Sequence, residues 1–212
     1  MQVLKFGGTS VANAQNMSKV VDIVTKAVDR DRTILVASAI SGCTDTLIRI
    51  GNLAAERDET YKELINGLQE RHHEIIDEFL PREKQADSTK VCDSLFDSLR
   101  SIAQGVFLLG ELSPASLDAI QGFGELWSTK ILATKLASIG IATKWVDSRQ
   151  IIRTVSKNGK NVVDVQKTYF RINEMVENDP VSQLFVLPGF IASDKQGRTT
   201  TLGRGGSDYT AS

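Results

Sequence analysis

The segment that most constrains the fold is residues 33–38, Thr-Ile-Leu-Val-Ala-Ser, which contains four consecutive apolar residues. A strand without polar alternation is typical of a parallel sheet that is covered on both faces. Residues 3–6 form a shorter apolar segment, and between the two segments Met17, Val20 and Val24 recur at helical spacing. The start of the chain therefore predicts a βαβ unit with parallel strands and a right-handed crossover.

The rest of the chain continues this alternation. In residues from about 45 to 109 the apolar side chains recur at helical spacing, and this stretch carries most of the charge. The pattern predicts a helical insertion between strands. Further helices are expected after Gly122 to about 138 and from Asp164 to about 176. One strand is expected at 184–187 and continues through 190–193, with a bend at Pro188-Gly189. The other expected strands are 142–146, 154–157, 160–163 and 199–202. Asn158-Gly159 predicts a type I′ hairpin turn. The fold class is therefore α/β, with a mostly parallel sheet between helices.

Composition excludes several classes of protein. The 25 Lys and Arg residues balance 26 Asp and Glu residues, and no basic stripe suggests a nucleic-acid partner. No apolar stretch is long enough for a membrane span, and two cysteines without framework spacing argue against a secreted disulfide scaffold. We therefore expect a cytoplasmic protein. Because residues 205–212 read as the first turns of a helix, we expect the chain to be a piece of a longer protein.

Two glycine-rich segments are candidates for binding an anion. Lys5-Phe6-Gly7-Gly8-Thr9-Ser10 ends the first strand, where glycine N–H groups, a helix N-terminus and a lysine can all face phosphate. Gly203-Arg204-Gly205-Gly206-Ser207-Asp208 combines an N–H concavity with an arginine suited to a carboxylate and an aspartate that can hold a lysine. The structural alternatives are a plain strand-to-helix turn and a loop with a solvated ion pair.

Two further segments carry weaker signals. Residues 38–44 place Ser38 and Thr44 after the second strand, where open α/β sheets bind ligands, although a helix cap explains them equally well. Gly122-Phe123-Gly124-Glu125 is interpreted as a turn that delivers a carboxylate to bind an ammonium group or to complement a helix dipole. His72-His73 lacks partners at ligand spacing, so we expect packing histidines and no protein-built metal site.

Together, these segments resemble the aspartate kinases, which have the amino-acid kinase fold. Lys5 to Val11, Ser38-Ala39 with Thr44, Gly124-Glu125, and the stretch from Gly203 to Tyr209 occur in the order seen in that family. The helical middle and Leu108-Leu109-Gly110-Glu111 are most similar to the N-terminal part of bifunctional aspartokinase–homoserine dehydrogenases. The resemblance makes residues 1–212 the N-terminal, amino-acid-binding part of a kinase domain, incomplete at its C-terminus.

The resemblance also implies a role for each motif residue. Lys5 and Asp208 would be catalytic, with Asp208 orienting Lys5 near the magnesium nucleotide. The residues that would contact ATP are Lys5, Gly7, Gly8, Ser10, Ser38, Gly205 and Gly206, and those that would hold L-aspartate are Thr44, Glu125, Arg204 and Ser207. Mg²⁺ would be held mainly through the nucleotide phosphates. We also expect a homo-oligomer.

The implied reaction is ATP-dependent phosphorylation of the side-chain carboxylate of L-aspartate, the first step toward lysine, threonine and methionine. That carboxylate has a pKa of about 3.9, so it is already ionised and needs no general base. The adenine pocket and regulatory domains of this family follow the Ser-Asp-Tyr motif, so we expect the isolated piece to be inactive. The alternatives are a kinase of another small acid, such as acetylglutamate, carbamate or a nucleoside monophosphate, and a non-catalytic binding or assembly module.

Overall fold

The computed structural model describes residues 1–157, 160–203 and 205–212. Its centre is a four-stranded parallel sheet with the order β1-β2-β6-β3. The strands are β1 (Gln2–Phe6), β2 (Thr33–Ala37), β3 (Thr143–Trp145) and β6 (Leu184–Pro188). Every residue of β2 and of β6 is buried, which explains their unbroken apolar sequences and confirms the parallel, doubly covered sheet.

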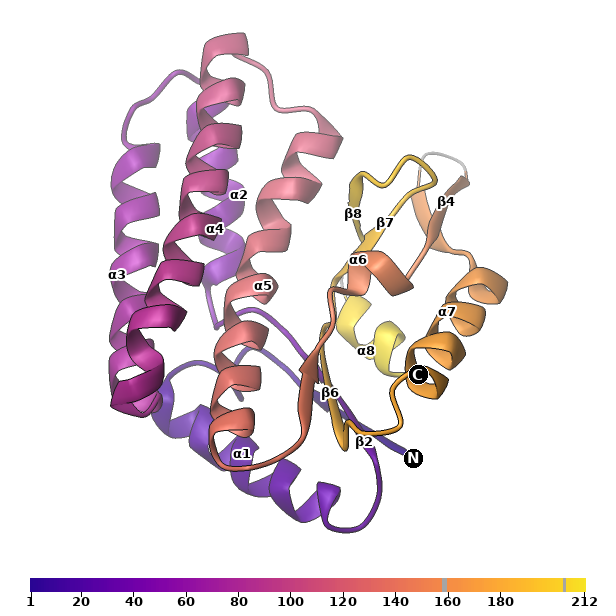
Figure 1. The fold of residues 1–212 in the computed structure, drawn as a ribbon. Helices are drawn as coiled ribbons and strands as arrows, with labels where there is room; N and C mark the ends of the chain where they lie inside the picture. Colours follow the sequence, from indigo (N-terminus) through magenta and orange to yellow (C-terminus); the bar gives the residue numbers. More distant parts are fainter. Residues whose placement is uncertain (158–159, 204) are drawn as a thin grey trace.

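Helices cover both faces of this sheet (Figure 1). Along β2 and β6, Leu35 and Val186 point into a core shared with α1 (Ala14–Val28) and α5 (Pro114–Ser138). Phe185 and Leu187 point into a second core with α7 (Val165–Glu177). The sandwiched α/β architecture expected from the sequence is therefore confirmed.

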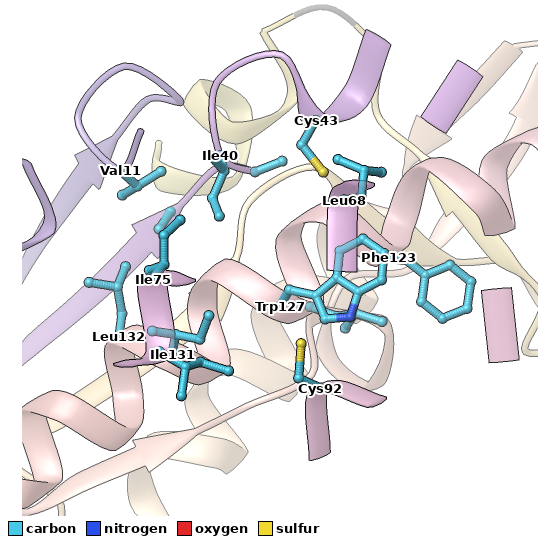
Figure 2. Close-up of a cluster of buried hydrophobic side chains, with 14 of the residues drawn as sticks. Val11, Ile40, Cys43, Leu68, Ile75, Cys92, Phe123, Trp127, Ile131 and Leu132 are labelled. Carbon is cyan, nitrogen blue, oxygen red and sulfur yellow. The ribbon is translucent and has the colours of Figure 1, made fainter. Parts of the chain in front are cut away.

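The helical stretch after β2 forms a bundle beside the sheet (Figure 1). It consists of α2 (Cys43–Ala55), α3 (Tyr61–Phe79) and α4 (Arg82–Leu109), and it packs against α5. Figure 2 shows part of its apolar interior. There the indole of Trp127 stacks on Phe96 at a centroid distance of 4.0 Å, and buried His72 packs against both rings.

The remaining elements are short strands and helices. They are α6 (Ser148–Ile151), the antiparallel pair β4 (Thr154–Lys157) and β5 (Lys160–Val163), the antiparallel pair β7 (Ile191–Ser193) and β8 (Thr199–Thr201), and the short helix α8 (Gly206–Ala211). Among them, β8 packs against α5. Asp164 caps α7, as predicted, by accepting a hydrogen bond from the backbone N–H of Lys167 at 3.2 Å. The predicted hairpin turn at Asn158-Gly159 lies outside the described residues.

Two further features concern the cysteines and the helices. Cys43 and Cys92 are buried free thiols, and burial raises the pKa of each to about 12. Among the helices of the described ranges, none combines the length and the apolar character needed to cross a bilayer.

The predicted turn at Gly122-Phe123-Gly124-Glu125 is wrong, because these residues lie inside α5. The glycines permit close packing and do not break the helix. A Cβ atom on Gly124 would lie 2.8 Å from the Cβ of Ala39, and one on Gly122 would lie 3.2 Å from Cγ2 of Ile191. Helix α5 therefore approaches the loop after β2 more closely than any side chain at position 124 would allow.

The predicted single bent strand through Pro188-Gly189 is also wrong. β6 ends at Pro188 in the main sheet, whereas β7 pairs with β8 in a separate two-stranded sheet. The chain changes sheets at Gly189, where a Cβ atom would lie 2.4 Å from the Cβ of Ser207. The close approach of α8 therefore requires glycine at this point.

The substitution Gly124→Ala is expected to destabilise the chain by about 1–3 kcal/mol, because the added methyl group overlaps Ala39 in a packed region. Gly67→Ala in α3 is the matched control, because open space surrounds that position. There the higher helix propensity of alanine should stabilise the chain by up to about 1 kcal/mol. Urea denaturation of both variants measures the two effects. Equal effects would contradict the close-packing role of Gly124.

Candidate active site

The C-terminal ends of three parallel strands lie level with one another. Phe6 at the end of β1 pairs with Ala37 of β2, which pairs with Pro188 of β6. The loops that begin at Gly7, Ser38 and Gly189 therefore leave the sheet side by side. In open α/β sheets, this edge is where ligands bind.

The loop after β1 packs directly on the loop after β2. A Cβ atom on Gly8 would lie 2.9 Å from the backbone oxygen of Ala39, so Gly8 is needed for this contact. The backbone N–H of Ser10 donates to the oxygen of Gly7 at 2.9 Å, which closes a tight turn before α1. This geometry is compatible with an anion-binding loop at the start of a helix.

An ion pair joins the beginning of the chain to its last helix. Nζ of Lys5 lies 2.6 Å from Oδ1 of Asp208, which belongs to the first turn of α8. Gly205, the N-cap residue of α8, has a left-handed backbone with φ of +77°. The side chain of Asp208 is 68% exposed, so the pair contributes little to stability. Its effect is to hold the Lys5 ammonium at the edge of the sheet.

A second contact brings the serines of two predicted motifs together. Oγ of Ser38 donates to Oγ of Ser207 at 3.0 Å. Ser128 of α5 donates from its Oγ to the backbone oxygen of Ser38 at 2.8 Å. Gly189 lets the first turn of α8 lie against the end of β6. The loop after β2, the end of β6 and α8 therefore meet at one place.

Glu125 is a buried carboxylate behind these loops. Its side chain is 3% exposed, and Oε2 accepts a hydrogen bond from the backbone N–H of Phe190 at 2.5 Å. Burial raises the pKa of Glu125 to about 8, although the backbone N–H groups of residues 189–191 and the charge of Lys5 oppose the shift. A carboxylate held in this way would be stabilised by a ligand that carries positive charge.

The other predicted residues are less closely connected. Thr44 lies in the first turn of α2, and no hydrogen bond joins its side chain to the residues above within the described chain. Gly206 is buried against Leu202 and Phe190, and it begins α8. Arg204 lies outside the described residues. The structure therefore brings together Lys5, Gly7, Gly8, Ser38, Glu125, Ser207 and Asp208.

Some contributors to this site were not predicted from the sequence. Ser128 and the backbone N–H of Phe190 act through contacts that link distant segments, and no local pattern marks them. Gly189 was interpreted as a bend, and its Pro-Gly sequence marks a change of direction without indicating the partner helix. These three residues position Ser38, Glu125 and α8.

A magnesium site built from protein side chains alone does not fit this edge of the sheet. In residues 1–157, 160–203 and 205–212, no group of three or more His, Cys, Asp and Glu side chains is arranged to hold a metal ion. Asp208 supplies a carboxylate next to Lys5. A magnesium ion carried mainly by phosphate oxygens, with at most one or two carboxylates, is compatible with this donor set.

Comparison with known proteins decides the family, because the sequence profile of the amino acid kinase family matches residues 1–212. The chain belongs to the amino acid kinase family. It is homologous to aspartate kinases, as the motifs predicted. Over 211 residues it is 29% identical to bifunctional aspartokinase/homoserine dehydrogenase 2, chloroplastic, of Arabidopsis thaliana, covering 99% of this chain and 23% of that protein.

This amino acid kinase chain is also similar to a bacterial enzyme. It is 32% identical over 225 residues to lysine-sensitive aspartokinase 3 of Escherichia coli, covering 99% of this chain and 44% of that protein. The crystal structure of E. coli aspartokinase III in complex with aspartate and ADP superposes with a TM-score of 0.86 and 29% identity, covering 100% of this chain and 45% of that one. The chain therefore spans less than half the length of these relatives.

The buried carboxyl of Glu125 predicts a pH dependence of stability. In the folded chain the carboxyl group of Glu125 stays protonated up to about pH 8, whereas in the unfolded chain it loses its proton near pH 4.5. The folded state therefore binds more protons in this range. The free energy of unfolding of the wild type, relative to Glu125→Gln, should fall as the pH rises through the range, by at most about 1.4 kcal/mol per pH unit.

Urea denaturation at several pH values measures this difference, because titrations shared by the two proteins cancel. A difference that stays constant, or that increases with pH, would show that Glu125 is ionised in the folded chain at neutral pH.

Proposed function

We propose that residues 1–212 form the amino-acid-binding part of an aspartate kinase. The reaction transfers the γ-phosphoryl group of ATP to the side-chain carboxylate of L-aspartate and yields ADP and 4-phospho-L-aspartate. It is the first step of lysine, threonine and methionine biosynthesis. The observation that carries the proposal is the Lys5–Asp208 ion pair, held between the Gly7-Gly8 loop and α8 with Glu125 buried behind it.

The comparisons support this choice of substrates. The bacterial structure that superposes on the whole chain is described as a complex with aspartate and ADP. A second structure of the same enzyme, described as a complex with lysine and aspartate, has a TM-score of 0.88 and 30% identity to this chain. We extend aspartate and ATP from that enzyme to this chain.

The chemistry fits the side chains at the sheet edge. A carboxylate with a pKa of about 3.9 is ionised at neutral pH, so it attacks phosphorus without a general base. The reaction then depends on in-line positioning and on neutralising the negative charge of the phosphoryl group. Lys5 supplies a positive charge, the N–H groups of Gly7 and Gly8 can donate to phosphate oxygens, and Asp208 orients Lys5. Magnesium bound to the nucleotide would add further charge neutralisation.

Recognition of the amino acid is assigned to the remaining motif residues. Glu125 would bind the α-ammonium group, Arg204 the α-carboxylate, and Thr44 and Ser207 would contact the substrate. The raised pKa of Glu125 adds a consequence for binding. Because the ammonium group favours the ionised carboxylate, L-aspartate should bind more tightly as the pH rises toward about 8, with proton release from Glu125.

A free α-ammonium group should therefore be required for binding. The wild-type chain should bind L-aspartate more tightly than N-acetyl-L-aspartate, and Glu125→Gln should remove most of this preference. Calorimetric titration of both ligands measures it. Glu111→Gln, an exposed position before α5, is the matched control and should retain the preference.

The outcomes distinguish the alternatives. Equal affinity for the acetylated ligand in the wild type would favour a kinase of an acylated acid. No binding of either ligand by a folded sample would favour a non-catalytic module. Loss of L-aspartate binding in Arg204→Ala would support the role assigned to that arginine.

The ion pair predicts a loss of phosphoryl transfer when either partner is neutralised. Lys5→Met should lower L-aspartate-dependent ADP release by roughly 100-fold or more, because it removes a charge that stabilises the transition state. Asp208→Asn should cause a smaller loss, because Lys5 keeps its charge and loses its orientation. Because the isolated piece is expected to be inactive, the assay is made on a polypeptide that also supplies the rest of the kinase domain. Retained turnover in Lys5→Met would contradict the assignment.

The cytoplasmic location predicted from the sequence is part of the same proposal. The buried free thiols Cys43 and Cys92 agree with a reducing compartment.

A further inference from the structure

Arg71, on helix α3, hydrogen-bonds to two of the loops at the candidate active site. One guanidinium nitrogen, Nη1, donates to the backbone oxygen of Ser41 at 2.9 Å, and Nη2 donates to the backbone oxygen of Ala12 at 3.1 Å. Ala12 lies in the loop between β1 and α1, and Ser41 lies in the loop between β2 and α2. Within the described chain, no other side chain hydrogen-bonds to both loops.

These two loops carry groups assigned to the nucleotide, and the second loop leads to Thr44, which is assigned to the substrate. The first contains Gly7 and Gly8, and the second begins with Ser38. The loops also touch each other where Gly8 meets the backbone oxygen of Ala39. Their spacing therefore sets where the glycine N–H groups lie relative to Ser38 and its partner Ser207.

The packing of α3 directs Arg71 toward the loops. Leu68 and Ile75 are buried, and together with Arg71 they follow the three- and four-residue spacing of one helix face. Val11 and Ile40, which precede Ala12 and Ser41, belong to the same buried cluster, as Figure 2 shows. This apolar cluster holds α3 against the two loops, and Arg71 then hydrogen-bonds to both of them.

An arginine suits this position better than a lysine. Its planar guanidinium presents several N–H donors in a fixed arrangement and can contact two carbonyl groups at once, whereas a lysine ammonium is a compact charge on a flexible stem. The contact to Ser41 is exposed and the contact to Ala12 is partly buried. Water can therefore replace the guanidinium when it is removed, so the fold should survive while the loops lose their tie.

We infer that Arg71 is a positioning residue that holds the loop after β1 and the loop after β2 at a fixed spacing, an inference that rests on the proposed function. The hydrogen bonds of Arg71 go to backbone oxygens of the two loops. Arg71 acts through the backbone of residues 7–12 and 38–41, and it connects the helical bundle to the site.

The test compares Arg71→Met, Arg71→Lys and the control Arg100→Met by amide hydrogen exchange. Arg100 lies in the same bundle and contacts Asn66 and Gln69, away from the loops. In Arg71→Met, exchange in residues 7–12 and 39–42 should become about tenfold faster while β2 stays unchanged, because two charge-assisted hydrogen bonds are lost. Arg71→Lys should be intermediate, and Arg100→Met should match the wild type.

Calorimetric titration of L-aspartate into the same proteins tests the effect on binding. The affinity should fall about tenfold in Arg71→Met, less in Arg71→Lys, and not at all in Arg100→Met. Unchanged amide exchange in the two loops of Arg71→Met would overturn the inference. Exchange that accelerates equally in the loops and in β2 would also overturn it, because it indicates a general loss of stability. Unchanged affinity in Arg71→Met, with normal binding in the wild type, would also overturn it.

Failure of the proposed function gives a different result. If neither the folded wild-type chain nor a polypeptide that supplies the rest of the kinase domain binds L-aspartate, the assignment of aspartate as substrate fails. The exchange measurement alone then decides whether Arg71 holds the loops.

Discussion

The parallel register of β1, β2 and β6 is the constraint on which the rest of this structure depends. Phe6, Ala37 and Pro188 end their strands at the same level. The loops after β1, β2 and β6 leave the sheet from that line, whereas the loop before α8 follows β8 of a separate sheet. The glycines then set how closely these segments approach one another. At Gly8, Gly124 and Gly189, a single added carbon atom would meet a neighbour at less than 3.0 Å. The site is thus assembled by close backbone packing around a fixed sheet edge.

Glu125 illustrates how such packing prepares a chemical function. Enclosing a carboxyl group costs free energy unless it is protonated or paired with positive charge. The chain provides the Phe190 N–H as a hydrogen-bond donor and leaves a cationic ligand to complete the neutralisation. The same burial that opposes ionisation in the free chain would strengthen attraction to an ammonium group, because surrounding water is excluded. In the proposed function, substrate recognition and the pH dependence of stability would have one physical origin.

Local sequence patterns predicted much of this fold. The apolar segment of β2 indicated a doubly covered strand, and the charges of Lys5 and Asp208, next to glycine-rich turns, indicated groups that the structure joins at 2.6 Å. Patterns failed where one residue type has two uses. Glycine serves both turns and close helix packing, so residues 122–125 were interpreted as a turn although they lie in a helix. The role of Arg71 was not predicted for a related reason, because a charged residue on a helix usually faces solvent. The hydrogen-bond partners of Arg71 lie 30 and 59 positions away in the sequence.

The Lys5–Asp208 contact also has a consequence for how the protein comes into being. One partner belongs to the first strand and the other to the last helix, so the pair closes nearly the whole length of the chain. Contacts between segments this distant form late, after the local helices and the neighbouring strands. During synthesis Lys5 leaves the ribosome long before Asp208. The charged centre of the site therefore forms only after α8 has been synthesised and lies against Gly189.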